Sequence, residues 1–402
     1  MKGKTGESIE KAVKELSGTR LRVRRMAREE GIAGQGRQVA VVGAGPIGLE
    51  AALRCRLCGL AVTVYEQGEV GEYLQQWGHV RLFTPWGWNV TPLGLQVLQQ
   101  EYPRRQWPSA EHLLTGWQYR EEYLLPLAES EWLKGCVRPR TQVVQIGPSR
   151  DGRTWRLLLH DANGVEQHAY ADVVLDCSGI YGQPRWLGEG DVPALGERAA
   201  RAHIPHGVVD ISGTHRGRYA GKSVLVVGGG YSAASNVVAL ASLAEQHAET
   251  WVYWVHHGPR GQPLPRIPHD PLPERDRLAA RANMLAARGD GHVEYFAQTV
   301  LHEVRYLGPE GGFYVAGHQR GQPVAWNVEQ VIAAVGYRAV PLSGFVPELP
   351  DRPYYVLGSK SQPRSFLLAE GHRQLDAVLG RLIGPSYASV CARVASKGKR
   401  AA

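Results

Sequence analysis

The sequence predicts an α/β fold with two parallel sheets, and one repeated pattern carries that prediction. Residues 39–53 (VAVVGAGPIGLEAAL) and 224–238 (VLVVGGGYSAASNVV) each contain a short apolar run, a glycine cluster and a stretch of helical character. Continuous apolar runs are typical of parallel strands that are buried on both faces. A strand, a glycine-rich turn and a helix begin a βαβ unit, so we expect two such units in this chain.

The composition favours a folded, soluble protein of two or three domains. The chain has 402 residues, of which 43% are hydrophobic and 21% are charged. These values exclude a disordered or fibrous chain. No run of about 18 uncharged apolar residues occurs, and the N-terminus lacks the apolar core of a signal peptide. Five cysteines are too few for a disulfide framework. We therefore expect a cytoplasmic protein without membrane insertion.

The N-terminal extension, residues 1–36, is basic. Residues 1–38 hold ten Lys or Arg and five Glu, a net charge of +5 out of +8 for the whole chain. One interpretation is an arm that binds an acidic partner, and the other is a solvated, partly helical extension. Aromatic residues do not alternate with the charges, so no nucleic-acid partner is predicted. The positive charge would also attract a phosphorylated cofactor.

The first glycine cluster has the spacing of a dinucleotide-binding loop, with Gly43, Gly45 and Gly48 in the pattern G-x-G-x-x-G. These glycines suit a sharp turn, a close approach to a pyrophosphate and tight helix packing, and the helix N-terminus offers free N–H groups. Pro46 fits the first helical turn. The next strand ends at Glu66, 23 residues after Gly43, where a carboxylate binds ribose hydroxyls. This arrangement favours an adenosine ribose without a 2′-phosphate.

The second glycine cluster predicts a different ribose. Gly228, Gly230 and Ala233 form G-x-G-x-x-A, and the following strand WVYWV ends in His256-His257, with Arg260 shortly after. Basic groups in this place complement the 2′-phosphate of NADPH. The alternative is a polar strand end without a ligand. Two sites with different riboses indicate two dinucleotides. A flavin and a nicotinamide are the simplest pair, because hydride transfer between them is common chemistry.

With these motifs, the sequence resembles the flavoproteins that have two dinucleotide-binding domains, the superfamily of flavin monooxygenases and pyridine nucleotide–disulfide reductases. Residues 171–184 (ADVVLDCSGIYGQP), 328–340 (VEQVIAAVGYRAV) and 354–375 match its crossover and closing segments, and the resemblance covers about residues 37–385. It implies an FAD-binding Rossmann-like domain with an inserted NAD(P)-binding Rossmann-like domain. The expected boundaries are 37–184 with 336–388 for FAD, 185–335 for NADPH, and 389–402 for a C-terminal tail.

The resemblance also implies the residues that contact each cofactor. In the superfamily a Gly-Asp pair closes the FAD site, but here Ser359 follows Gly358, so the usual aspartate is replaced by a hydroxyl. The residues expected at FAD are Gly43, Ala44, Gly45, Pro46, Ile47, Gly48, Glu66, Gln67, Val143, Ser178, Gly179, Gly336, Gly358 and Ser359. Those expected at NADPH are Gly228, Gly230, Tyr231, Ser232, Ala233, His256, His257 and Arg260.

The distribution of cysteines separates the two chemistries of the superfamily. Disulfide reductases need a dithiol that faces the flavin, either on the helix after the ribose-binding acid or in the NADPH domain. Residues 68–86 and 183–334 contain no cysteine. The C-x-x-C formed by Cys55 and Cys58 falls late on the first helix, just before Gly59, where small residues pack against the sheet. We expect this pair to be packing and not a redox centre.

Other features resemble flavin monooxygenases. The second loop has the G-x-G-x-S-A pattern, and the linker at residues 211–222 keeps the His215–Tyr219 spacing of their fingerprint, although Ile211 replaces its phenylalanine. A polar interdomain linker is the other interpretation. We predict a single-component, FAD- and NADPH-dependent monooxygenase that acts on a small molecule with O₂ through a flavin (hydro)peroxide. The alternatives are an NADPH-dependent reductase or oxidase and a non-catalytic FAD-binding scaffold, and homodimer formation is left open.

The aromatic and cationic segment WGHVRLFTPWGW (77–88) is expected near the flavin ring. Arg81 would stabilise the reduced flavin or a peroxide, and His79 would exchange a proton. The alternative is that the tryptophans are core and Arg81 pairs with an acid. Residues 266–285 are expected to form a turn-rich stretch and then a helix, with no assigned role. The histidines lack metal-ligand spacing, so no metal is predicted.

Overall fold

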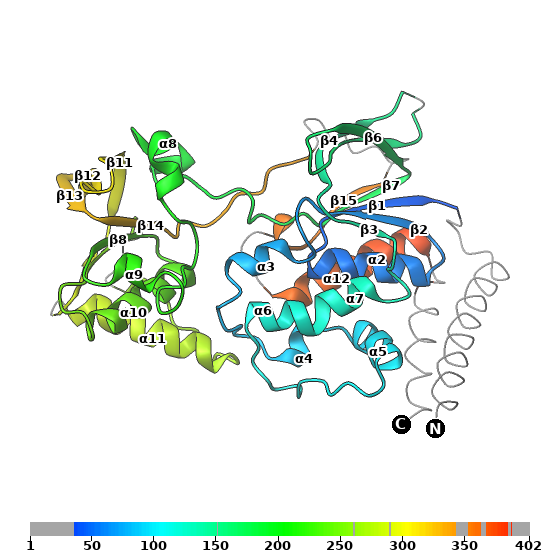
Figure 1. The fold of residues 1–402 in the computed structure, drawn as a ribbon, viewed down its shortest axis with the longest axis horizontal. Coiled ribbons are helices and arrows are strands. Elements are labelled where there is room, and N and C mark those ends of the chain that lie inside the picture. Colours follow the sequence, from blue (N-terminus) through cyan, green and yellow to red (C-terminus); the bar gives the residue numbers. More distant parts are fainter. Residues whose placement is uncertain are drawn as a thin grey trace, which may run out of the picture.

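A computed structural model describes residues 36–387 except residues 151, 260–261, 289–290, 343–352, 363–366 and 385–386. The described chain forms two bodies that are joined by two extended segments (Figure 1). Each body has a parallel sheet with helices on one face and a three-stranded antiparallel sheet on the other. The predicted α/β class, with one Rossmann-like unit inserted into another, is confirmed.

The first body is built on a parallel sheet with the strand order β15-β7-β1-β2-β3. Its strands are β1 (Gln38–Val42), β2 (Ala61–Tyr65), β3 (Val137–Arg138), β7 (Val173–Asp176) and β15 (Tyr354–Val356). Above it lies the antiparallel sheet of β4 (Gln142–Pro148), β5 (Trp155–His160) and β6 (Glu166–Ala171). The last strand, β15, returns from the far end of the sequence to pair with β7.

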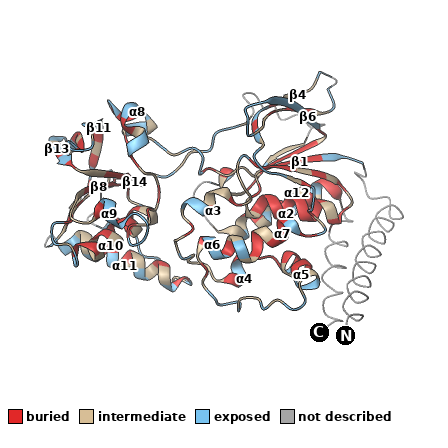
Figure 2. Cartoon of the chain, viewed as in Figure 1, coloured by how far each residue is buried: buried red, intermediate tan, exposed pale blue. Residues whose placement is uncertain are grey.

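The helices of the first body lie mainly on the opposite face of this sheet (Figure 1). They are α2 (Pro46–Leu57), α3 (Glu72–Gln76), α4 (Trp86–Asn89), α5 (Pro92–Glu101), α6 (Gly116–Tyr119), α7 (Leu125–Glu129) and α12 (Leu368–Ile383). A π-helical turn, Arg120–Leu124, joins α6 to α7, and Gly358–Lys360 is a 3-10 turn. Buried residues are concentrated on β1, α2 and α12 (Figure 2).

Strand β1 shows why the apolar runs in the sequence are continuous. Val39 and Val41 pack into the core with α2 and α12, whereas Ala40 and Val42 pack into the core with the β4–β6 sheet. Successive side chains of a strand point to opposite faces, so a strand between two layers must be apolar at every position. The same alternation occurs in the central strand of the second body.

The second body repeats this design with the strand order β10-β9-β8-β14. Its parallel strands are β8 (Ser223–Val227), β9 (Trp251–Val255), β10 (Val293–Phe296) and β14 (Gln330–Ala333), and its antiparallel strands are β11 (Thr299–Tyr306), β12 (Phe313–Gln319) and β13 (Gln322–Val328). Its helices are α8 (Glu197–Ala200), α9 (Arg216–Tyr219), α10 (Tyr231–Ala244) and α11 (Pro273–Arg288), with 3-10 turns at Glu189–Asp191 and Arg201–His203.

Two connecting segments run side by side between the bodies. Pro184 and Tyr337 form an antiparallel bridge, and the Arg185 and Arg338 N–H groups donate to the carbonyls of Gly336 (3.0 Å) and Gln183 (2.9 Å). The domain boundaries expected from the sequence lie on these two segments. The tail at 389–402, and all but Gly36 of the extension at 1–36, lie outside the described residues. Within the described part of the chain, no helix is long and apolar enough to cross a membrane.

Candidate cofactor and active site

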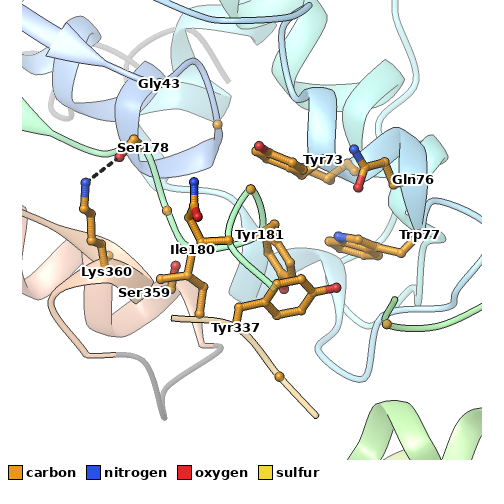
Figure 3. A pocket seen from close by; sticks show the side chains of 18 of the residues that line it. Gly43, Tyr73, Gln76, Trp77, Ser178, Ile180, Tyr181, Tyr337, Ser359 and Lys360 are labelled. Atoms are coloured by element: carbon orange, nitrogen blue, oxygen red, sulfur yellow. Dashed lines mark hydrogen bonds between the residues drawn. The ribbon is translucent and has the colours of Figure 1, made fainter. Parts of the chain in front are cut away.

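One large cavity, about 1760 Å³, is lined by residues of both glycine loops. The first body contributes the loop at the start of α2 and part of α3, and the second contributes the loop at the start of α10. The two connecting segments supply further lining residues, including Tyr181 and Tyr337 (Figure 3). A cavity of this size, shared by both loops, can hold two dinucleotide ends close together.

The two loops have the same local geometry. Gly45 and Gly230 are the N-caps of α2 and α10, and neither helix has a side-chain cap, so the first backbone N–H groups remain free for an anion. A Cβ placed on either glycine would have no other described atom within 4 Å, so the space beside each loop is open. Gly43 and Gly228 have positive φ angles of 97° and 138°. A side chain at either of these two positions would collide with the backbone of the neighbouring crossover segment.

Glu66 closes the first loop from the end of β2. One carboxylate oxygen accepts a hydrogen bond from the Ala44 N–H (2.7 Å), and the other accepts one from the Gly68 N–H (3.0 Å). Burial raises the pKa of this carboxyl group, and the two N–H donors oppose that rise. Glu66, the acid expected at a ribose, lines the main cavity next to the loop.

His256 occupies the equivalent position in the second loop, at the end of β9. Its ring fills the space where side chains at Gly229 and Gly258 would otherwise lie, and its Nδ1 is 3.1 Å from the Tyr295 hydroxyl. Burial, and then the neighbouring His257, lower the pKa of His256. Both histidines line the main cavity, whereas Arg260 lies outside the described residues.

The other residues expected at the cofactors fall into two groups. Those that line the main cavity are Gly43, Gly45, Pro46, Ile47, Gln67, Val143, Ser178, Gly179, Gly228, Gly230, Tyr231, Ser232, Gly336, Gly358 and Ser359. Ala44, Gly48 and Ala233 are buried behind the loops. Gly48 packs so closely on the Gly43 carbonyl that a Cβ would overlap it, and Ala233 is a core residue in the first turn of α10.

The cavity has an aromatic wall at the junction of the two bodies (Figure 3). Tyr181 contacts Tyr337 edge to face with ring centroids 4.9 Å apart, and it also lies 6.0 Å from Tyr73 and 6.1 Å from Trp77. Burial raises the pKa of Tyr337 to about 12, so its hydroxyl stays protonated at neutral pH. This wall can exclude water from a planar ring.

The two residues expected to take part in chemistry lie in different places. Arg81 lines the main cavity and forms a backbone bridge with Thr115. His79 instead lines a second cavity of about 250 Å³, together with Asp210 and Tyr219. Burial lowers the pKa of His79, and Asp210 opposes that change. The segment 77–88 is therefore divided between the two cavities, which the even spacing of its side chains did not indicate.

Three cationic side chains that the sequence did not single out line the main cavity, namely Arg185, Arg275 and Lys360. Arg275, at the start of α11, lines the main cavity and is held by Asp270 through bonds of 2.8 and 2.6 Å. Lys360 lines the cavity beside the first loop and pairs with Asp176. The sequence did contain one sign of the Asp176–Lys360 pair, since Asp176 is an acid at the end of the otherwise apolar strand VVLD.

Both cysteines of the C-x-x-C are buried. Cys55 and Cys58 are 0% and 1% exposed and belong to the core between α2 and the sheet. Helix α2 ends at Leu57, and Gly59 follows in a left-handed conformation, as expected for the helix stop. Among the described residues that line the main cavity, Cys177 is the one cysteine.

Comparison with known proteins identifies the family. A family model described as pyridine nucleotide-disulphide oxidoreductase matches residues 40–339, which is more than half of the chain. The chain belongs to this family. It is therefore a flavoprotein oxidoreductase, and the prediction of FAD and NADPH as cofactors agrees with the family. No curated protein matches the chain by sequence.

Solved structures share the fold at low sequence identity. Bacillithiol disulfide reductase Bdr (YpdA) from Bacillus cereus has a TM-score of 0.60 and 16% identity, covering 89% of this chain and 99% of that one. The FAD-bound cadaverine monooxygenase DfoA from Erwinia amylovora has a TM-score of 0.62 and 17% identity, covering 87% and 95%. Ornithine hydroxylase PvdA from Pseudomonas aeruginosa has a TM-score of 0.60 and 15% identity, covering 87% and 98%. Both reductases and monooxygenases therefore share this fold.

Proposed function

We propose that this protein is an FAD- and NADPH-dependent monooxygenase that transfers one oxygen atom of O₂ to a small molecule. The observation that carries the proposal is the single main cavity shared by two phosphate-binding loops, whose described lining contains one cysteine, Cys177, and not a pair. Burial raises the pKa of the Cys177 thiol, so it is a poor thiolate nucleophile. A relay through a dithiol finds no support in this lining.

The residues around the first loop fit FAD. The free N–H groups at the start of α2 would bind the diphosphate, and Glu66, which lines the same cavity, would accept hydrogen bonds from ribose hydroxyls. Gly358 lies against Ile47 at the start of α2, and the Ser359 hydroxyl is 3.7 Å from a Cβ placed on Gly179. We assign these residues to the flavin's diphosphate and ribityl chain. Bound FAD supplies hydride acceptance and reaction with O₂.

The second loop fits NADPH. The start of α10 would bind the diphosphate, and His257 and Arg275 place cationic or ionisable groups on the same cavity wall. The His256 ring is packed against Gly229, and burial lowers its pKa, so we assign it to supporting the loop and not to binding the 2′-phosphate. Arg260 remains a proposed ligand of the 2′-phosphate from its place in the sequence.

The reacting centre would lie against the aromatic wall of Tyr73, Trp77, Tyr181 and Tyr337. These rings would exclude water, which keeps reduced oxygen species from decaying before they meet the substrate. Arg81 is the cationic side chain from the 77–88 segment on this cavity, and we assign it to stabilising negative charge. His79 faces the smaller cavity, so we assign it to the contact between the two bodies.

The experiment that tests the proposal follows both atoms of O₂. Purified protein should be yellow, and NADPH oxidation should consume O₂ with H₂O₂ as the product when no substrate is present. A true substrate should lower the yield of H₂O₂ per NADPH and should acquire one atom of ¹⁸O from ¹⁸O₂. Stoichiometric H₂O₂ with every candidate would overturn the monooxygenase and favour an NADPH oxidase. Colourless protein that takes up no FAD would overturn both the monooxygenase and the oxidase, and would favour a non-catalytic scaffold.

A reductase that passes electrons to a small acceptor is the second candidate. The shared fold of Bdr, a bacillithiol disulfide reductase, supports it, as does the position of Cys177 on the cavity wall. It predicts NADPH-dependent reduction of a quinone or a low-molecular-weight disulfide without O₂. Anaerobic assays with these acceptors separate it from the monooxygenase, which needs O₂ for product.

A further inference from the structure

Lys360 is a buried lysine in the wall of the main cavity. It ends the 3-10 turn Gly358–Lys360, and its side chain is only 5% exposed (Figure 3). Lysine is rarely buried unless its charge is compensated, because removing an ammonium group from water is costly. The turn lies where the superfamily has a Gly-Asp pair, so a cation lines the cavity one residue after Ser359, which takes the place of the acid.

Asp176 compensates this charge and is itself fully enclosed. It ends β7, its side chain is 0% exposed, and its Oδ2 accepts hydrogen bonds from the Lys360 Nζ (2.7 Å) and the Tyr354 hydroxyl (2.8 Å). Its Oδ1 accepts from the Ser178 hydroxyl (2.6 Å) and the Ser178 N–H (3.2 Å). Four donors therefore fix the carboxylate in one orientation.

The lysine keeps one donor available for a ligand. An ammonium group has three N–H bonds, and those of Lys360 reach Asp176 Oδ2 and the Ser178 hydroxyl (3.0 Å), which leaves one without a partner among the described residues. Ser178 adjoins the first glycine loop, since its Cα is 3.0 Å from a Cβ placed on Gly43. The third N–H of Lys360 is therefore next to the first glycine loop, which we assign to the diphosphate.

We propose that Lys360 is an FAD-binding residue, whose third N–H donates to an oxygen of the diphosphate–ribityl part of the cofactor. Asp176 is the positioning residue that holds the ammonium group at this point. The pair is neutral by itself, so the lysine offsets the repulsion that a lone Asp176 would exert on a diphosphate. This inference rests on the proposed binding of FAD at the first loop and adds a cationic ligand directly after Ser359, the residue that replaces the usual aspartate.

Three variants test this role through the affinity of apoprotein for FAD, measured from the quenching of flavin fluorescence. Lys360→Met should bind FAD about 10- to 100-fold more weakly, the effect of losing a charge-assisted hydrogen bond. Asp176→Asn should stay within about threefold of the wild type, because the lysine keeps its charge and a polar partner. The double variant D176N/K360M should remain about as weak as Lys360→Met. Lys222→Met is the matched control, because this lysine also pairs with an acid (Glu329, 2.7 Å) but does not line the cavity.

The double variant decides between a ligand and a structural ion pair. If Lys360 only neutralises Asp176, removing both charges restores wild-type affinity, and that result would overturn the proposal. Equal losses in Asp176→Asn and Lys360→Met would overturn it too. Far-UV circular dichroism and thermal unfolding of each apoprotein show whether it is folded. If Lys360→Met does not fold, D176N/K360M decides alone, because it buries no unpaired charge and wild-type affinity in it would overturn the proposal. Wild-type protein that binds no FAD would instead reject the proposed cofactor site itself.

Discussion

Phe83 and Tyr231 meet edge to face across the junction of the two bodies, with ring centroids 5.7 Å apart and planes inclined by 65°. Phe83 comes from the segment between α3 and α4, and Tyr231 is the first residue of α10. Both line the main cavity. The start of the proposed NADPH-binding helix is therefore in direct contact with the body that carries the proposed flavin site.

Removing this contact should impair the use of NADPH and leave FAD binding intact. An aromatic pair contributes about 0.5–1.5 kcal/mol beyond its buried area, so Phe83→Ala should lower the rate of flavin reduction by NADPH about 2- to 12-fold. Stopped-flow absorbance under anaerobic conditions measures that rate. Trp88→Ala is the control, since Trp88 is 46% exposed and does not line the cavity. Loss of FAD from Phe83→Ala at an unchanged reduction rate would contradict this role.

Arg275 and Arg277 offer a matched pair on α11. Arg275 lines the cavity and is held by Asp270, whereas Arg277 is exposed and pairs with Glu274. Arg275→Ala should raise the KM for NADPH about 10-fold or more, because a phosphate loses a cation and meets an unpaired Asp270. Arg277→Ala should leave that KM within about twofold. Equal effects of the two variants would show that Arg275 acts only through the net charge of the helix.

The stability of the protein should fall in acid through His372. Burial, and then Arg54, lower the pKa of His372 from 6.5 to about 4 in the folded state. Between these two values the unfolded chain binds the proton more strongly, so the stability present above pH 6.5 is lost as the pH falls towards 4. The difference corresponds to about 1–3 kcal/mol. Urea unfolding at pH 7 and pH 4.5 measures it.

His372→Gln isolates this contribution from other titrating groups. His206 has a similarly lowered pKa of about 4 from burial and the nearby Arg201, so the wild type should lose stability through both histidines. The variant should lose less stability than the wild type over the same pH range. If both lose the same amount, His372 does not titrate differently in the folded and unfolded chain, and the assigned pKa is wrong.

The features that the sequence predicted well are local ones. The loops at Gly43 and Gly228, the strands that precede them and the helix stop at Gly59 all depend on residues close together in the chain. Apolar runs at β1 and β8 predicted burial on both faces because each strand lies between two layers. Such patterns need no knowledge of distant contacts.

The features that the sequence missed depend on distant residues. Asp176 and Lys360 are 184 positions apart and meet only because β15 returns to pair with β7. His79 and Arg81 line different cavities because Asp210 and Tyr219 of the second body lie around His79. Neither relationship leaves a periodic pattern in the sequence, so only the folded chain shows which charges share a site.

Cys55 and Cys58 should take no part in electron transfer. Both are buried in the core under the sheet, and burial, followed by the neighbouring Cys58, raises the pKa of the Cys55 thiol. The double variant C55A/C58A should therefore oxidise NADPH at the wild-type rate and lose only about 1–2 kcal/mol of stability for the two small cavities. In the native protein, iodoacetamide followed by mass spectrometry should label neither thiol, and unfolding in urea should expose both. Rapid labelling of either cysteine after reduction by NADPH, together with lost turnover in the variant, would mean that a dithiol works here and that oxygen transfer is not the reaction.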